Sequence, residues 1–219
     1  MAEEIVLPLR LLHLLPRNGE PSFAPLVEML SIGYHACDRG KVEREDNVLV
    51  IGAGPIGLGA ALVAKDRGAR VGIVDQLESR LRLSQELGID FTFQASDGIE
   101  SDVIARFGSR PNVVVEAVGN PKTLEQAVNI VSSAGRVAFV GWTSQSLQLK
   151  PDLFLKKELD LVGSRNSSGI FPQVIDFYCR NLVKAKKLVS HRFTMNEIEK
   201  AMDFIDTEGN KTMKVIMEW

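Results

Sequence analysis

The chain has 219 residues, enough to bury a sizeable core, and its net charge of -2 and pI near 6.0 give no basic footprint for nucleic acid. No apolar run approaches the roughly 20 residues of a membrane helix, and the start of the sequence shows no secretory signal pattern. The two cysteines lack CxxC spacing and are typical of free thiols in a reducing compartment, so we expect a cytoplasmic protein that binds neither nucleic acid nor membrane.

The first 27 residues are apolar but irregular, and four prolines among them exclude a long helix. The run IVLP at 5–8 predicts a short strand. Residues 26–39 suit a helix, with Gly40 as its C-terminal stop. We interpret residues 1–27 as the tail of a domain that is mostly absent.

A glycine-rich turn follows the first clear strand, in the run VLVIGAGPIG at 48–57. Gly52 permits a tight turn, Gly54 lets a pyrophosphate approach the backbone, and Gly57 lets the helix pack close to the strand. The next strand ends at Asp75, 18 residues beyond Gly57, where a carboxylate can bind both ribose hydroxyls. The order of strand, turn, helix, strand and acid predicts a dinucleotide site; the alternative is a glycine-rich turn in an unrelated α/β protein.

The residues around this motif indicate which coenzyme to expect. Pro55 and Ile56 open the helix, whose free N–H groups and positive dipole end favour phosphate. Asp75 would repel a 2′-phosphate, so NAD is favoured over NADP. Arg80 has two interpretations: it stacks on adenine or contacts a phosphate, or it is a solvated helix residue.

From residue 48 onward, strand-like and helix-like runs alternate regularly. Strands that are apolar throughout are typical of sheets buried on both faces, and their alternation with helices predicts parallel crossovers. We therefore predict an α/β protein with a doubly wound, six-stranded parallel Rossmann sheet. The predicted strands are 48–51, 71–75, 91–94, 113–116, 137–140 and 159–162, and the predicted helices are 56–67, 77–87, 99–107, 121–133 and 151–157.

The pattern changes after residue 163. A helix at 170–182, an extended stretch at 187–193, a helix at 195–205 and a strand at 212–217 are predicted. These segments continue the sheet poorly. We expect three parts: 1–27 as the tail described above, 28–165 as an NAD-binding domain, and 166–219 as a segment returning toward the absent domain.

Several stretches, in order along nearly the whole chain, resemble the medium-chain, zinc-dependent alcohol and polyol dehydrogenases, in the branch of the sorbitol, threonine and sugar-acid enzymes. They are FAPLVEMLSIGYHA at 23–36, NVLVIGAGPIG at 47–57, EAVG at 116–119, FVG at 139–141, GSRN at 163–166, SHRF at 190–193 and KVI at 214–216. The resemblance implies oxidation of a secondary alcohol to a ketone by hydride transfer to NAD. It also implies that residues 1–27 and 166–219 are remnants of a GroES-like catalytic domain.

The family's catalytic zinc is held by residues of that GroES-like domain, which this sequence mostly lacks. Glu28 matches a family carboxylate at or near the metal and is the single remnant of a zinc site that we name. Two isolated cysteines and three scattered histidines do not offer converging ligands. We therefore name no catalytic residue, and we expect a truncated chain without zinc or activity of its own. The alternatives are a non-catalytic NAD-binding module and a zinc-free relative of the quinone reductases.

The resemblance and the position of three loops at carboxyl ends of strands complete the predicted coenzyme site. The loop residues are Ala117, Val118 and Gly119, then Val140, Gly141 and Trp142, then Ser164, Arg165 and Asn166.

The family joins two such sheets through the sixth strand, so we also expect a homodimer or a higher homo-oligomer. We expect an exposed apolar patch as well, which includes residues 182, 183, 198, 204, 205, 215 and 216.

Overall fold

The computed structural model describes residues 4–167 and 169–219, and the chain divides into two compact units. One unit comprises Met29–Ser168, and the other comprises Met1–Glu28 together with Gly169–Trp219. Each unit has its own sheet.

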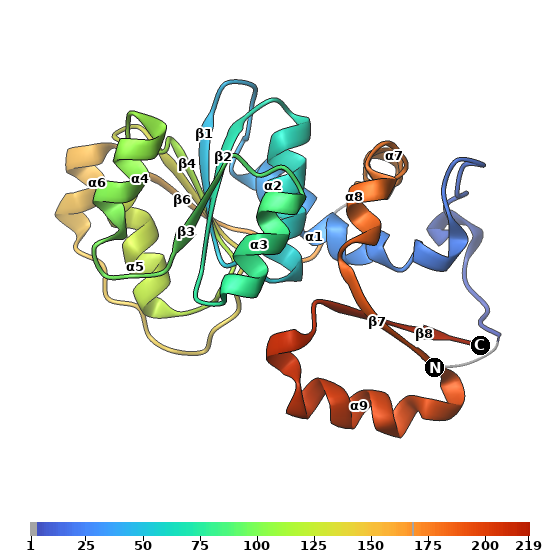
Figure 1. Ribbon diagram of the computed structural model, residues 1–219. Helices are drawn as coiled ribbons and strands as arrows, with labels where there is room; N and C mark the ends of the chain where they lie inside the picture. The colour runs from blue at the N-terminus through green and yellow to red at the C-terminus, as the bar shows by residue number, and fades with distance from the viewer. Residues whose placement is uncertain (1–3, 168) are drawn as a thin grey trace. The chain divides into compact units, whose positions relative to one another are not determined.

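The larger unit is built on a six-stranded, fully parallel sheet with the order β3-β2-β1-β4-β5-β6 (Figure 1). The chain starts at the centre, moves outward to β3, then crosses back and continues to β6. This is the predicted doubly wound Rossmann sheet, which the structure confirms. The strands are β1 (Asn47–Ile51), β2 (Arg70–Asp75), β3 (Phe91–Gln94), β4 (Val113–Glu116), β5 (Arg136–Phe139) and β6 (Asp160–Gly163).

Helices cover both faces of this sheet, with α2 and α3 on one side and α4, α5 and α6 on the other (Figure 1). The predicted helices are all present, although α5 ends three residues earlier than expected. The bounds are α1 (Leu26–Arg39), α2 (Pro55–Asp66), α3 (Glu78–Glu86), α4 (Ile99–Phe107), α5 (Pro121–Ile130) and α6 (Pro151–Lys157).

The centre of the sheet is almost completely buried, because its strands are apolar on both faces. Val48, Leu49 and Val50 have no exposed surface. α1 packs tightly on α2, and a Cβ on Gly33 would lie 2.5 Å from Ala60 N. This framework fixes the carboxyl ends of β1, β2 and β4 next to one another.

The smaller unit carries two parallel strands, β7 (Val189–Thr194) and β8 (Lys214–Glu218), joined through α9 (Ile198–Thr207) (Figure 1). The predicted helix at 170–182 is two helices, α7 (Phe171–Arg180) and α8 (Leu182–Lys186), because Asn181 leaves helical geometry. Short 3-10 turns are η1 (Leu9–Leu11), η2 (Pro21–Phe23), η3 (Met195–Glu197) and η4 (Gly209–Lys211).

Two expectations for this unit were wrong. Residues 5–8 form no strand, since Ile5 and Val6 are 76% and 98% exposed and pair with no other strand. Ile216 does not belong to an exposed patch, because it is 4% exposed, whereas Val183 is 78% exposed. Of the five residues of β8, the central one, Ile216, is the one that is buried.

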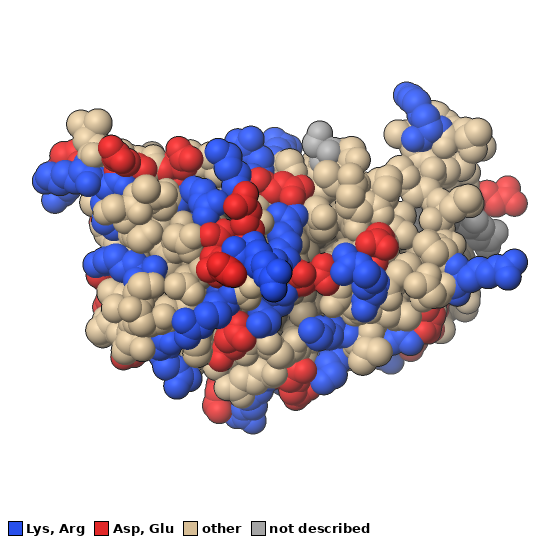
Figure 2. Space-filling view, turned by 90° about the horizontal axis from the view of Figure 1, so that it is seen from above, with Lys and Arg blue, Asp and Glu red and all other residues tan. Residues whose placement is uncertain are grey.

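Charges of both signs are interspersed over the face seen in Figure 2. Within the described ranges, no helix is both long and apolar enough to cross a bilayer.

Candidate functional site

The glycine turn between β1 and α2 has the geometry that the sequence predicts. Gly52 has φ +100°, a left-handed conformation that favours glycine. A Cβ on Gly57 would lie 1.8 Å from Gly52 O, so only glycine allows this approach of helix to turn. A Cβ on Gly54 would meet nothing within 4 Å, which leaves open space above the turn. Pro55 and Ile56 start α2, and no side chain caps its first turn.

Asp75 closes β2 and points to this turn. Its side chain is 7% exposed, and Oδ2 accepts a hydrogen bond from Ala53 N at 2.7 Å, while Oδ1 accepts one from Leu77 N at 2.8 Å. Arg80 Nη1 lies 3.7 Å from Oδ2. Each carboxylate oxygen retains a further lone pair. The carboxylate thus joins the glycine turn to the start of α3.

Arg80 lies at this site rather than on a solvated face of α3. Its side chain is 25% exposed, and its Nε is buried without a hydrogen-bond partner among the described residues. A buried donor without an acceptor is costly, so this nitrogen is available to a ligand atom.

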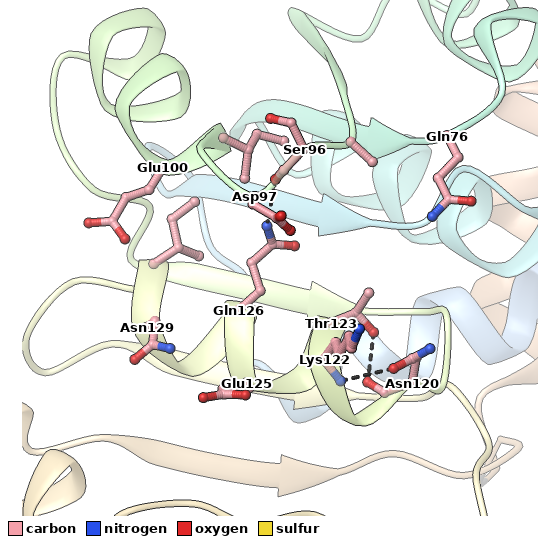
Figure 3. A pocket seen from close by; sticks show the side chains of 13 residues that line it. Gln76, Ser96, Asp97, Glu100, Asn120, Lys122, Thr123, Glu125, Gln126 and Asn129 are labelled. Carbon is pink, nitrogen blue, oxygen red and sulfur yellow. Dashed lines mark hydrogen bonds between the residues drawn. The ribbon is translucent and has the colours of Figure 1, made fainter.

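A pocket of about 610 Å³ adjoins Asp75 at the carboxyl ends of β2, β3 and β4. Figure 3 shows Gln126 reaching from α5 toward the loop that carries Ser96, and its Nε2 lies 3.4 Å from Ser96 O. The sequence did not identify this pocket, because its residues come from the loops after β2, β3 and β4 and from α4 and α5. Its polar lining residues are Gln76, Ser96, Asp97, Glu100, Asn120, Lys122, Thr123, Glu125, Gln126 and Asn129.

A second pocket of about 620 Å³ lies where β4, β5 and β6 end. It brings together the three loops predicted from the sequence, although Gly119 is not among its lining residues. The predicted residues that line it are Ile56, Ala117, Val118, Val140, Gly141, Trp142, Ser164, Arg165 and Asn166.

Two features of this second pocket bear on what it could hold. Ser164 is 8% exposed, and its hydroxyl has no hydrogen-bond partner among the described residues. Trp142 is 77% exposed, and the guanidinium of Arg165 lies 5.1 Å from the centre of its ring, a cation–π contact. A ligand with apolar faces and a hydrogen-bonding group fits this combination.

Glu116 is a residue of this region that the sequence did not mark as functional. It ends β4, is 1% exposed, and its Oε1 accepts hydrogen bonds from Val118 N and Gly119 N, both at 2.9 Å. A glutamate at a strand end gives no sequence signal of which N–H groups it will face.

The described residues do not fit a zinc ion. Glu28 lies exposed in the first turn of α1. Within residues 4–167 and 169–219, no group of three or more His, Cys, Asp or Glu side chains could hold a metal. Zinc sites require three or four converging protein ligands, and the described residues bring no such group together.

Comparisons with known proteins agree with this geometry. A family model described as zinc-binding dehydrogenase matches residues 55–180. L-idonate 5-dehydrogenase of Vitis vinifera is 31% identical over 225 residues, covering 99% of this chain and 61% of that protein. Sorbitol dehydrogenase of Rattus norvegicus is 33% identical over 187 residues, covering 83% of this chain and 52% of that protein.

A solved structure that contains a bound coenzyme is also similar to this chain. The short chain alcohol dehydrogenase RspB from E. coli CFT073, complexed with NADH, matches with a TM-score of 0.90 at 27% identity, over 97% of this chain and 64% of that one. The chain thus spans 52–64% of the length of these three relatives. The matched family model covers more than half of the chain, and the chain belongs to the zinc-binding dehydrogenase family.

Proposed function

We propose that this chain binds NAD across the two pockets of its larger unit and forms the coenzyme-binding part of a dehydrogenase that oxidises a secondary alcohol to a ketone. When bound, NAD accepts the hydride from the alcohol carbon, while the hydroxyl proton leaves to a base or to solvent. The names of the two curated relatives, L-idonate 5-dehydrogenase and sorbitol dehydrogenase, leave sugar acids and polyols as the substrate classes to test.

The observation that carries the proposal is the position of Asp75 against the glycine turn. The carboxylate is held 2.7 Å from Ala53 N, beside the open space at Gly54. A pyrophosphate over that space would accept hydrogen bonds from the free N–H groups of the first turn of α2. The ribose hydroxyls of adenosine would then donate to the remaining lone pairs of Asp75.

The two pockets support opposite ends of the coenzyme. The pocket beside Asp75 suits adenine, since Gln76 follows Asp75 directly and Asn120 offers amide groups. The pocket at β4–β6 suits nicotinamide, since the Ser164 hydroxyl lacks a partner and an amide could supply one. A buried carboxylate at Asp75 disfavours a 2′-phosphate, which argues against the quinone-reductase alternative and its usual NADPH preference.

A non-catalytic NAD-binding module is the second candidate. It is favoured by the finding that the described residues contain no group able to hold a metal. Both candidates bind NAD, so the test is zinc analysis together with an NAD-linked oxidation assay on sorbitol and an aldonate. Turnover by the purified chain excludes the module, whereas binding without turnover is the result expected of either candidate.

The coenzyme proposal is tested by titrating the purified chain with NADH and NADPH at pH 7, followed by nicotinamide fluorescence. We expect NADH to bind more tightly. Asp75→Asn should weaken NADH about tenfold or more, because each hydrogen bond to a charged group contributes roughly 1.5–3 kcal/mol. The same variant should also show a smaller preference for NADH over NADPH. Asp102→Asn, an exposed acid on α4, is the charge-matched control. An unchanged NADH affinity in Asp75→Asn contradicts the proposal.

We also propose a homodimer through β6. This strand is an edge of the sheet, so one row of its backbone groups has no partner strand within the described residues. Leu161 and Val162 are half-buried on it. Asp160 N and Ser164 N both donate to β5, so the N–H of Leu161 between them faces the open edge. Light scattering should give the mass of a dimer, and Leu161→Pro should shift the mass to that of a monomer; a wild-type monomer at high concentration contradicts this proposal.

A further inference from the structure

The segment that follows β4, residues 117–123, is a wall shared by both pockets. Ala117 and Val118 line the pocket at the ends of β4, β5 and β6. Asn120, Lys122 and Thr123 line the pocket beside Asp75, as Figure 3 shows. The position of this segment therefore sets the spacing between the two pockets.

One carboxylate holds the segment in place. Glu116 Oε1 accepts hydrogen bonds from Val118 N and Gly119 N, both at 2.9 Å, and lies 2.8 Å from Thr123 Oγ. The two successive N–H groups therefore point at one oxygen, and Gly119 has φ +79°, a left-handed conformation that favours glycine. Such a concave pair of backbone N–H groups binds anions, and here the anion is the side chain of the chain's own Glu116.

The backbone of Glu116 links this segment to the next loop. Its carbonyl oxygen accepts from Val140 N at 2.8 Å and from Gly141 N at 3.1 Å. The two loops are in direct backbone contact, since a Cβ on Gly141 would lie 2.0 Å from Gly119 N. A displacement of residues 117–119 would therefore displace the loop that leads to Trp142.

The charge of Glu116 has a specific role in this arrangement. The side chain is 1% exposed, and no Lys or Arg of the described residues forms an ion pair with it. Its burial is offset by hydrogen bonds, which are strongest when the acceptor is charged. A glutamine of the same shape would be a weaker acceptor for the three donors that meet Oε1.

We propose that Glu116 is a positioning residue for the coenzyme: its carboxylate fixes residues 117–123 and so sets the distance between the adenine and nicotinamide pockets. This inference rests on the proposed function. A ligand that occupies both pockets at once depends on their spacing, whereas a mononucleotide in one pocket does not. Loss of the carboxylate should therefore weaken binding of the dinucleotide more than binding of either mononucleotide.

The test compares NADH, AMP and NMN on the wild-type chain and on Glu116→Gln, with binding followed by calorimetry and folding by circular dichroism. We expect NADH to bind at least fivefold more weakly to the variant, while AMP and NMN each change less than twofold. Asp46→Asn is the matched control, because Asp46 is also a buried carboxylate but lies before β1, at the opposite end of the sheet. It should leave all three affinities unchanged.

The outcomes separate the two proposals. A wild-type chain that does not bind NADH refutes the proposed function and this inference with it. A wild-type chain that binds NADH, with Glu116→Gln binding equally well or losing all three ligands in proportion, refutes the role of Glu116 alone. If the Gln variant does not fold, Glu116→Asp is the variant to test. Its side chain is one methylene shorter, so the carboxylate keeps its charge but lies farther from the N–H groups. NADH affinity should fall by less than fivefold, and the affinities for AMP and NMN should not change.

Discussion

Glycine-to-alanine substitutions at three positions near the start of α2 should separate effects on stability from effects on NADH binding, because each adds a single methyl group. A Cβ on Gly57 would lie 1.8 Å from Gly52 O, about 1.2 Å short of the 3.0 Å below which real Cβ contacts essentially never occur. The neighbour is a backbone oxygen of a tight turn, which cannot rotate away as a side chain can. Gly57→Ala must therefore push α2 away from β1.

The expected cost of Gly57→Ala follows from this displacement. Overpacking a well-packed core costs typically 1–3 kcal/mol and more where the backbone must move. Because the clash is with backbone, we expect about 3 kcal/mol or more, which for a chain of this size lowers Tm by roughly 6–12 °C. NADH affinity should fall as well, since the turn and the helix start both move.

The other two glycines provide the contrast. A Cβ on Gly59 would meet Leu30 Cδ2 at 3.6 Å, an ordinary contact, so Gly59→Ala should stabilise the chain by roughly 0.5–1 kcal/mol through helix propensity. A Cβ on Gly54 would meet nothing within 4 Å. Gly54→Ala should lower the free energy of unfolding by no more than about 1 kcal/mol, because alanine is a poorer N-cap. It should nevertheless weaken NADH binding about tenfold or more, because the methyl group fills the space for pyrophosphate.

Thermal melts by circular dichroism and NADH titrations on the three variants give both quantities. A Gly57→Ala variant with the Tm of the wild type would contradict the backbone clash at Gly52 O, and a Gly54→Ala variant with the NADH affinity of the wild type would contradict the pyrophosphate position. A Gly59→Ala variant that melts several degrees lower would show that the helix packing is tighter than its contact distances indicate.

Two further predictions concern groups away from the proposed coenzyme site. Burial raises the pKa of the Cys37 thiol to about 12, so at pH 8 only about one molecule in ten thousand carries the thiolate, and a thiol reagent should modify Cys179 first and Cys37 only on unfolding. Because this folded pKa is raised above the unfolded value of 9.0, the thiol's contribution to stability is lost as pH rises above about 9, and Cys37→Ala should flatten urea-measured stability in that range. Asp46 accepts hydrogen bonds from Arg136 Nη2 at 2.9 Å and from Glu43 N at 2.8 Å, and also from the Asn112 amide, so Asp46→Ala should lower the free energy of unfolding by about 2 kcal/mol or more; a loss below about 0.5 kcal/mol would contradict this.

The sequence predicts most of the sheet and the glycine turn because their signals are local. Apolar strand runs, the spacing of the glycines and Asp75 all lie within short windows. Residues 5–8 mislead for the same reason: their composition suits a strand, but no neighbouring strand pairs with them. Strand formation depends on partners, and the window contains no information about them.

The missed parts of the site depend on contacts between loops. The pocket beside Asp75 takes residues from after β2, β3 and β4, so its existence requires the strand order. Glu116 is similar, because its role comes from the N–H groups of Val118 and Gly119 that meet its carboxylate, and the sequence does not show where a turn directs such groups.

Three carboxylates are buried in the described parts of the larger unit, and the end of the sheet at which each lies distinguishes their roles. Asp46 precedes β1, at the amino ends of the strands, and joins the starts of β1 and β5 through Arg136. Asp75 and Glu116 follow β2 and β4, at the carboxyl ends where ligands bind in such sheets. All three accept backbone N–H groups, so burial and hydrogen bonding do not separate them. The free energy of unfolding should therefore respond to Asp46. The NADH affinity per folded molecule should respond to Asp75 and Glu116, because of the three only these two hold backbone at the proposed coenzyme site.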